Sequence, residues 1–318
     1  MQKILIIGIT SQDGYNMLSY LANHNYIIYG TYHTESKIDK NDKLYKNIQL
    51  LYMDLQNKNN ITEVIKRVVP DFCLNFASAQ PQYETNNINL FQTNTISTIH
   101  ILDSLIEYNN KCKYLSCGSC WEIGKNINGN IDLDTKCNPD TIYGITKLTN
   151  RHIINHYKNT HNMFAIHVVL FNHDSARRAD AFICKKIINH FKKIWAGEDV
   201  EPFFCENIDA EKDWSDSRDF IKAIWLMLNE PIPNNYILSS GKSHALLEIV
   251  EIICKNLNID NIVINNEDEY KIYMKNKLIF VGKHCNKNSI AIGNNSETCN
   301  ILNWKPEISF EQMILDMI

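Results

Sequence analysis

A tyrosine and a lysine four residues apart are the residues whose types and spacing most directly suggest chemistry. Tyr143 and Lys147 stand in "YGITK", a segment with helical spacing, so both side chains share one helix face. A phenol exchanges protons near neutral pH only when its pKa is lowered, and a neighbouring ammonium has that effect. Ser119 precedes the pair by about two dozen residues and could hydrogen-bond a substrate oxygen. The three residues predict a catalytic set for hydride transfer, with Tyr143 as the proton donor.

The loop that holds Ser119 offers further reactive groups. "SCGSCWEIG" (116–124) contains two thiols and one carboxylate, and we expect Cys120, Trp121 and Glu122 to contact a substrate. Cys117 and Cys120 form a lone CxxC. Zinc would require a second pair or histidines at ligand spacing, and the sequence has neither, so we expect ordinary thiols and no metal.

A glycine-containing turn follows the first apolar segment. "KILIIGI" (3–9) has the pattern of a strand buried on both faces, and it leads into "GITSQDG" and then a segment with helical spacing. A strand–turn–helix junction of this kind directs backbone N–H groups at an anion, and glycines let a pyrophosphate approach the main chain. We therefore predict a dinucleotide site in this turn, formed by Gly8, Thr10, Ser11, Gln12, Asp13 and Gly14.

The end of the second expected strand bears on the choice of dinucleotide. NAD enzymes favour an acidic residue there, which binds the ribose diol. The strand here ends in "TYHTES", in which His33 and Thr34 could bind a 2′-phosphate. We therefore expect NADP(H), with NAD(H) as the alternative.

The elements that must position these residues alternate along the chain. Strands are predicted at 3–9, 26–33, 47–55, 71–78, 113–119 and 164–172, and helices at 15–25, 61–69, 89–109 and 141–159. This order predicts an α/β fold, a Rossmann-like doubly wound parallel sheet. After about residue 173 the pattern changes to helices at 178–197, 219–229 and 245–258 around a strand at 235–241. We expect a Rossmann domain at 1–172 and a smaller mixed α/β region at 173–318, with the chain crossing back at least once.

Composition excludes several classes of protein. The 318 residues carry a net charge of -4, which gives no general attraction to nucleic acid or anionic membranes. No apolar run reaches roughly 18 residues, the length that spans a bilayer. The apolar run at the N-terminus is too short for a signal peptide and ends in the turn described above. We expect a cytoplasmic protein.

Several segments of the sequence resemble a known family. They are "GITSQDG", "YMDL" (52–55), "PDFCLNFAS" (70–78), "YGITK", "LFNHDSARRADAFICKKI" (170–187), "KDWSDSRDF" (212–220) and "NWKPEISFEQMI" (303–314). They are similar to the extended short-chain dehydrogenase/reductases that act on nucleotide sugars, and most to GDP-mannose 4,6-dehydratases and their ketoreductase relatives. The resemblance extends over nearly the whole chain.

The resemblance implies roles for matching positions. Asp54 and Leu55 would contact the adenine of the cofactor, and Ala77 its ribose and pyrophosphate. Asn172, Lys185 and Lys212 would bind the diphosphate of a nucleotide sugar, although both lysines lack the bidentate fork of arginine. The family's late Arg-Pro-x-Glu stretch is not evident in this sequence, and "GKHCNK" (282–287) falls near its place. The resemblance also implies a homodimer, in which the helices at 89–109 and 141–159 form a four-helix bundle.

The loop after the fifth strand bears on which reaction follows. A 4,6-dehydratase of this family uses Thr-Ser-Glu or Thr-Asp-Glu there, and alignment on Gly124 places Ser119, Cys120 and Trp121 at those positions. Glu122 is one residue later, and a shift of one residue turns a side chain to the opposite face of an extended loop. "GSCWEIG" is more similar to the "Gly-Ser-Ser-x-Glu-Tyr-Gly" of relatives that reduce 4-keto-6-deoxy sugars.

We therefore expect an NADPH-dependent 4-ketoreductase in which Ser119 polarises the ketone, Tyr143 donates the proton and Lys147 lowers the pKa of Tyr143. The alternative is a 4,6-dehydratase that uses Glu122 or Cys120 for the elimination. A 4-epimerase would use the same three residues, and a non-catalytic nucleotide-sugar binder would not need all of them. The nucleotide, the sugar and its C4 configuration stay open.

Overall fold

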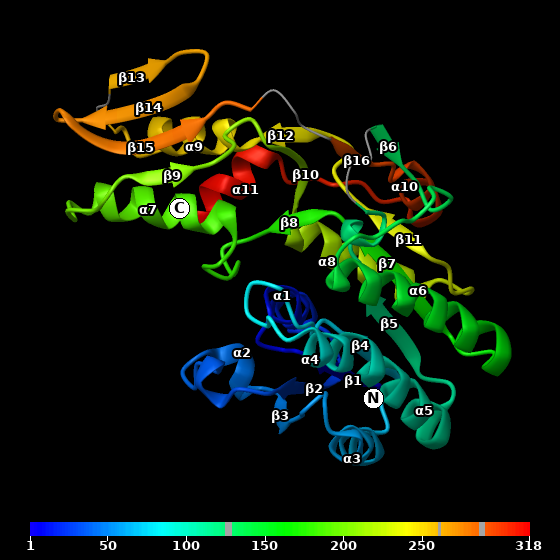
Figure 1. Ribbon diagram of the computed structural model, residues 1–318. Helices are drawn as coiled ribbons and strands as arrows, with labels where there is room; N and C mark the ends of the chain where they lie inside the picture. The colour runs from blue at the N-terminus through cyan, green and yellow to red at the C-terminus, as the bar shows by residue number, and fades with distance from the viewer. Residues whose placement is uncertain (125–128, 260–261, 286–289) are drawn as a thin grey trace.

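The main sheet is parallel, and most of its strands come from the N-terminal half of the chain. The computed structural model describes residues 1–124, 129–259, 262–285 and 290–318. Seven strands pair in the order β11-β7-β5-β4-β1-β2-β3, all of them parallel (Figure 1). They are β1 (Lys3–Ile7), β2 (Ile27–Tyr32), β3 (Gln49–Tyr52), β4 (Phe72–Asn75), β5 (Lys113–Cys117), β7 (Ala165–Leu170) and β11 (Tyr236–Leu238).

Helices cover both faces of this sheet, which explains the apolar strands. Along β1, Ile4 and Ile6 pack on one face while Leu5 and Ile7 pack on the other. The first face is covered by α1 (Gln12–Leu21) and α8 (Ser217–Asn229), with the short α2 (Lys43–Lys46) beside them. The second face is covered by α3 (Lys58–Val68), α5 (Ser97–Asn109) and α6 (Ile142–His161). The prediction of a doubly wound parallel sheet is confirmed.

The helix expected over 89–109 is interrupted. The structure has α4 (Asn87–Phe91), a π-helical turn η2 (Gln92–Ile96) and then α5. Asn94 lies in that turn and holds the loop after β4, because its side chain accepts the Ala79 N–H at 2.7 Å and donates to the Ala79 carbonyl at 3.0 Å. Single π-helical turns of this kind are frequent at functional sites.

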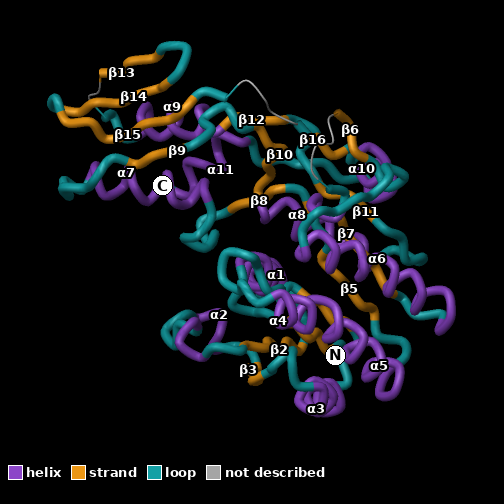
Figure 2. Tube along the Cα trace, in the orientation of Figure 1, coloured by secondary structure: helices purple, strands orange, loops and turns teal. Residues whose placement is uncertain are grey.

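Among the described residues, the C-terminal half of the chain supplies most strands of three smaller sheets and has its own core. Figure 2 shows most elements of this core in the upper left part of the view, away from α3 and α5. Its buried apolar side chains come mainly from α7, α9, α11 and the strands β14 and β15. The helices are α7 (Ile183–Trp195), α9 (Leu246–Asn256), α10 (Ser296–Leu302) and α11 (Phe310–Met317). The short helical turns η1 (Glu35–Lys37) and η3 (Cys120–Glu122) belong to loops at the carboxyl ends of β2 and β5.

The strands of these smaller sheets were mostly missed by sequence analysis. One sheet joins β12 (Ser243–Ala245), β10 (Glu211–Asp216) and β8 (Asn172–Asp174). Another joins β13 (Ile262–Asn265), β14 (Glu269–Met274), β15 (Lys277–Lys283) and β9 (Phe203–Cys205), and a pair joins β16 (Ala291–Gly293) and β6 (Gly129–Ile131). The strand predicted at 235–241 exists as β11, and it belongs to the main sheet, so the chain crosses back there.

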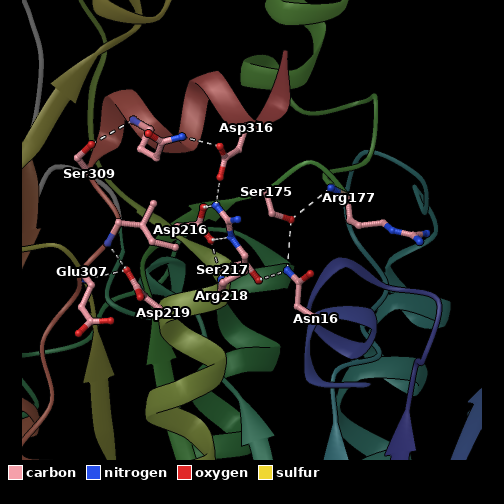
Figure 3. Close-up of polar contacts among 12 residues, drawn as sticks. Asn16, Ser175, Arg177, Asp216, Ser217, Arg218, Asp219, Glu307, Ser309 and Asp316 are labelled. Carbon is pink, nitrogen blue, oxygen red and sulfur yellow. Dashed lines mark hydrogen bonds and ion pairs between the residues drawn. The ribbon is translucent and has the colours of Figure 1, made fainter. Parts of the chain in front are cut away.

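Polar contacts at the start of α8 tie the two regions together. Asn16 on α1 donates to Ser217 Oγ at 2.9 Å and to Ser175 Oγ at 3.3 Å (Figure 3). Asp219 accepts the backbone N–H groups of Glu307 at 2.9 Å and of Ile308 at 2.8 Å. The start of α8 thus connects α1 to the C-terminal segment.

Candidate active site

The turn after β1 has no room for side chains at its two glycines. Gly8 adopts a φ of +80°, and a Cβ there would lie 2.8 Å from the backbone nitrogen of Ala77. A Cβ on Gly14 would lie 2.3 Å from the Gly8 carbonyl oxygen. Ser11 begins α1, and its hydroxyl accepts the Gly14 N–H at 3.0 Å. The serine that replaces a third glycine therefore caps the helix and leaves the close approach of the turn to β4 intact.

A cavity of about 440 Å³ lies along the carboxyl ends of β1 to β4, and we call it the β1 cavity. Most of the residues predicted to bind the dinucleotide line this cavity. Gly14 does not line it and packs instead against the Gly8 carbonyl group. The predicted residues that line it are Gly8, Thr10, Ser11, Gln12, Asp13, His33, Thr34, Asp54, Leu55 and Ala77. Sequence analysis missed three cations on its walls, Lys37, Arg177 and Arg178.

A larger cavity of about 840 Å³ opens beside the loop after β5, and we call it the β5 cavity. Ser119, Tyr143 and Lys147 all line it, so the structure brings the predicted catalytic set together. The two cavities are contiguous, because six residues line both. They are Asp13, Phe76, Ser78, Gln80, Arg178 and Phe182.

The helix α6 sets the geometry of the tyrosine and the lysine. Thr141 begins this helix and its hydroxyl accepts the Gly144 N–H at 3.1 Å. The buried Lys147 donates from Nζ to the Cys117 carbonyl at 2.9 Å, and its Nζ lies 5.4 Å from the centre of the Tyr143 ring. Gln80 donates to the Tyr143 hydroxyl at 3.3 Å. Sequence analysis missed Gln80, which follows β4 with no motif around it.

The loop after β5 corrects the expectation for Glu122. This side chain is 0% exposed and lies beneath the loop, outside the β5 cavity. Its Oε1 accepts from Arg151 Nε at 2.6 Å, and its Oε2 lies 3.0 Å from His167 Nε2 and 3.1 Å from the Ser119 backbone nitrogen. Burial opposes the charge of Glu122, but His167 and Arg151 outweigh it and lower its pKa to about 2. Glu122 is therefore buried as a charged group under the loop and does not line the cavity in which we expected it.

Cys120 and Trp121 do line the β5 cavity, as expected. Trp121 is 42% exposed and forms part of the cavity wall. Cys120 Sγ donates to Asn172 Oδ1 at 3.9 Å, which is within reach of a weak sulfur hydrogen bond. Burial raises the pKa of Cys120 to about 11 and that of Cys117 to about 12, so both thiols are protonated at neutral pH.

The basic residues of the β5 cavity differ from the expectation at one position. Asn172 and Lys212 line it, whereas Lys185 does not. Lys185 donates from Nζ to the Ala176 carbonyl at 3.1 Å, and Lys186 lines the cavity in its place. The two lysines are adjacent on α7, and one helical step of about 100° points them in different directions. The sequence "KK" could not distinguish them.

A partly buried ion pair that the sequence did not predict lies between the two cavities. His173 Nε2 lies 3.0 Å from Asp13 Oδ2, and His173 Nδ1 lies 2.7 Å from the Phe171 carbonyl oxygen. Ser217 donates to Asp13 Oδ1 at 2.7 Å. Burial opposes the charges, but their mutual attraction lowers the pKa of Asp13 and raises that of His173. The histidine stands in the "FNHDS" segment, so the residue was noticed but its partner was not.

Three further expectations concern metal ligands, membrane-spanning helices and the "GKHCNK" segment. Across the described parts of the chain, no three His, Cys, Asp or Glu side chains are arranged to hold a metal ion. The same residues include no helix long and apolar enough to cross a membrane. The last two residues of "GKHCNK" lie outside the described residues. Its His284 lies 2.9 Å from Asp209 Oδ1.

Comparisons with known proteins agree with this geometry. A family model described as GDP-mannose 4,6 dehydratase matches residues 5–317. GDP-mannose 4,6 dehydratase from Cricetulus griseus is 27% identical, over 99% of this chain and 90% of that protein. The protein of the same name from Homo sapiens is 26% identical, over 99% of this chain and 90% of that protein.

Two solved structures show the same fold. The structure of RMD from Pseudomonas aeruginosa complexed with NADPH has a TM-score of 0.79 at 16% identity, covering 100% of this chain and 97% of that chain. The structure of dTDP-glucose 4,6-dehydratase from Bacillus anthracis in complex with NAD has a TM-score of 0.79 at 19% identity, covering 100% of this chain and 95% of that chain.

Proposed function

The chain belongs to the GDP-mannose 4,6 dehydratase family, and from that premise we propose that it is a nicotinamide-dependent 4,6-dehydratase of a GDP-linked hexose. The observation that carries the proposal is that Ser119, Tyr143 and Lys147 together line the β5 cavity, beside Gln80, which lines both cavities and donates to the Tyr143 hydroxyl. A dinucleotide in the β1 cavity and a sugar in the β5 cavity would meet at these three side chains. The names of the relatives support GDP-mannose as the substrate.

This proposal replaces the expectation of a 4-ketoreductase, which is wrong. That expectation depended on one short loop, "GSCWEIG", and on the absence of a carboxylate at Trp121. The family model spans residues 5–317, and the relatives compared above are named GDP-mannose 4,6 dehydratases. Similarity over the whole chain outweighs a departure within seven residues of it.

We assign the cofactor to the β1 cavity, with NADP(H) favoured over NAD(H). The solved structures with this fold are complexed with NADPH in one case and NAD in the other. The walls of the β1 cavity include His33, Thr34 and Lys37, which suit a 2′-phosphate better than a bare ribose diol. A fluorescence titration with NADPH and NADH measures the preference, and tighter binding of NADH would reverse it.

The first half of the reaction uses the three catalytic residues. When bound, the nicotinamide accepts a hydride from C4 of the sugar and later returns it to C6. Tyr143 takes the proton of the C4 hydroxyl, and Lys147 on the same helix face supplies positive charge beside the phenol ring. Ser119 hydrogen-bonds the C4 oxygen and holds it in line with Tyr143. General acid–base catalysis requires both hydroxyls to come within hydrogen-bond reach of that one oxygen, and both line the β5 cavity.

The elimination step requires a group that gives one proton and takes another. Removal of water takes a proton from C5 and the hydroxyl from C6, and the new C4 ketone makes the C5 proton acidic. Because Glu122 is buried and Trp121 has no acid–base group, we assign this role to Cys120, which comes from the Ser119 loop and lines the β5 cavity. Its protonated thiol gives a proton to the departing hydroxyl, and the thiolate left behind takes the proton from C5. When the hydride returns to C6, C5 gains one proton, which balances the proton that Tyr143 took from the C4 hydroxyl.

We test the function with GDP-mannose and an amount of NADP⁺ far below that of the substrate. The expected product is GDP-mannose less one water, detected by mass spectrometry, with many turnovers per cofactor. In Cys120→Ala we expect the 4-keto sugar without loss of water, or no turnover, while NADP⁺ binding is retained. A C4 epimer of GDP-mannose, or net consumption of cofactor, would contradict the dehydratase.

A homodimer stays part of the proposal. The faces of α4, η2 and α6 expose apolar side chains, namely Ile88 at 70%, Ile96 at 36% and Ile145 at 38%. Light scattering coupled to size-exclusion chromatography measures the mass. A monomer at micromolar concentration would contradict this part of the proposal.

A further inference from the structure

Glu122 is the most heavily engaged side chain in the loop that carries Ser119. It is 0% exposed, and each of its carboxylate oxygens has a partner on a different element. Arg151 on α6 binds Oε1 through Nε at 2.6 Å and through Nη2, while His167 on β7 lies 3.0 Å from Oε2. The Ser119 N–H donates to the same Oε2 at 3.1 Å. One carboxylate thus connects the Ser119 loop to both α6 and β7.

The helix end of this connection lies in line with the catalytic residues. Tyr143, Lys147 and Arg151 follow one another at intervals of four residues on α6, so they share one face of the helix. Tyr143 and Lys147 face the β5 cavity, and Arg151 binds the carboxylate under the loop. The same rigid helix therefore carries the proton-transferring phenol and the anchor for the Ser119 loop.

The chain leaves space for the carboxylate directly below the loop. A Cβ at Gly118 would lie 2.6 Å from Glu122 Oε2 and 2.4 Å from His167 Nε2. Ser119 itself is extended and its hydroxyl accepts the Trp121 N–H at 3.3 Å, while Glu122 N–H donates to the Ser119 carbonyl at 3.0 Å. These two hydrogen bonds restrain the turn from Ser119 to Glu122.

We propose that Glu122 is a positioning residue, which holds the Ser119 hydroxyl at a fixed place relative to Tyr143 and Lys147 through its contacts with Arg151 and His167. The proposal rests on the proposed function only in that Ser119 binds the oxygen at C4. It gives Glu122 a role without any contact to substrate or cofactor. A small displacement of a catalytic group costs about 100-fold in rate.

Kinetics of Glu122→Gln test the role. We expect kcat for GDP-mannose to fall about 100-fold, while KM and the Kd of NADPH change less than about twofold, because neither ligand contacts Glu122. The matched control is Asp219→Asn, since Asp219 is also 0% exposed and binds the backbone N–H groups of Glu307 and Ile308, and none of these residues lines either cavity. The control lowers Tm without changing kcat per folded molecule.

A double variant separates positioning from stability. Removing only the carboxylate leaves Arg151 as a buried charge without its partner, and that is strongly destabilising. Glu122→Met combined with Arg151→Met removes both charges, so Tm recovers toward the parent value. We expect kcat to stay low in the double variant. Recovery of kcat together with Tm would overturn the proposal.

Hydrogen exchange gives a readout that needs no turnover. We expect faster amide exchange in peptides covering 117–124 of Glu122→Gln, with unchanged exchange in β4 and in α3. Unchanged exchange in 117–124 would overturn the proposal even if the protein had no activity on GDP-mannose. Failure of the proposed function appears instead as absence of the dehydrated product from the unmodified protein, whatever Glu122→Gln does.

Discussion

The β1 cavity and the β5 cavity place their functional groups in different ways. In the β1 cavity the groups stand at the carboxyl ends of adjacent parallel strands, and the pairing of β1 with β2 and β4 fixes where they lie. In the β5 cavity the groups come from a loop, from α6 and α7 and from the short strands β8 and β10. Strand ends are positioned by backbone hydrogen bonds, whereas the loop groups depend on which way single side chains point.

We expect the largest losses of rate from changes to the catalytic set that lines the β5 cavity. We expect Tyr143→Phe to reduce turnover about 1,000-fold, since a positioned acid–base group contributes about 10²–10⁴-fold. Binding of NADPH should be unchanged, as measured by fluorescence titration. Turnover near the parent level would mean that the proton moves through another group.

We predict that a side chain added in the turn beside the β1 cavity lowers stability and prevents cofactor binding. Gly8→Ala meets the Ala77 backbone at 2.8 Å and has a φ of +80°, so we expect a loss of about 3 kcal/mol in the free energy of unfolding and loss of NADPH binding. Gly197 is the matched control, because its φ is +83° with no atom within 4 Å of an added Cβ. Gly197→Ala should cost about 1–2 kcal/mol and retain binding. Equal effects, measured by denaturant unfolding, would contradict the close approach of the turn.

We predict that, of two adjacent lysines on α7, only the one that lines the β5 cavity contributes to substrate binding. We expect Lys186→Ala to raise KM for GDP-mannose about tenfold, because a charge-assisted hydrogen bond to a phosphate is worth about 1.5–3 kcal/mol. Lys185→Ala should change KM less than about twofold, since its ammonium binds the Ala176 carbonyl away from the cavity. Steady-state kinetics on both variants decide the point. A larger rise in KM for Lys185→Ala than for Lys186→Ala would instead support the sequence-based prediction that Lys185 binds the diphosphate.

The ion pair between the two cavities predicts a smaller effect that depends on pH. The pKa of His173 is raised in the folded protein, because Asp13 outweighs the opposing effect of burial. Its contribution to stability is therefore fully present below the ordinary histidine pKa of about 6.5 and is lost as pH rises through the raised folded pKa. Unfolding of the parent and of His173→Gln at about pH 6 and pH 9 should show a larger difference at pH 6. A larger difference at pH 9 would contradict the assignment.

Sequence patterns predicted the parts of the molecule that are set by backbone periodicity. The alternation of Ile4 and Ile6 with Leu5 and Ile7 indicated a strand covered on both faces, and the turn after it indicated the β1 cavity. The spacing of Tyr143 and Lys147 predicted their common helix face, which the β5 cavity confirms.

The sequence could not predict features of the site that depend on the direction in which an individual side chain points. Glu122 was expected in the cavity, but Arg151 and His167, which are distant in sequence, bind it under the loop. Lys185 and Lys186 differ only by one helical step. Gln80 contacts Tyr143, and His173 contacts Asp13. The two residues of each pair are distant in sequence, and only the fold brings them together.

The central claim is that one site oxidises C4, removes water and reduces C6 with no net use of cofactor. Transfer of deuterium tests it most directly. GDP-mannose labelled with deuterium at C4 is incubated with the protein and unlabelled NADP⁺, and the product is analysed by NMR. The account predicts deuterium in the C6 methyl group of a 4-keto product. Deuterium that accumulates in the reduced cofactor, or that stays at C4, would contradict it.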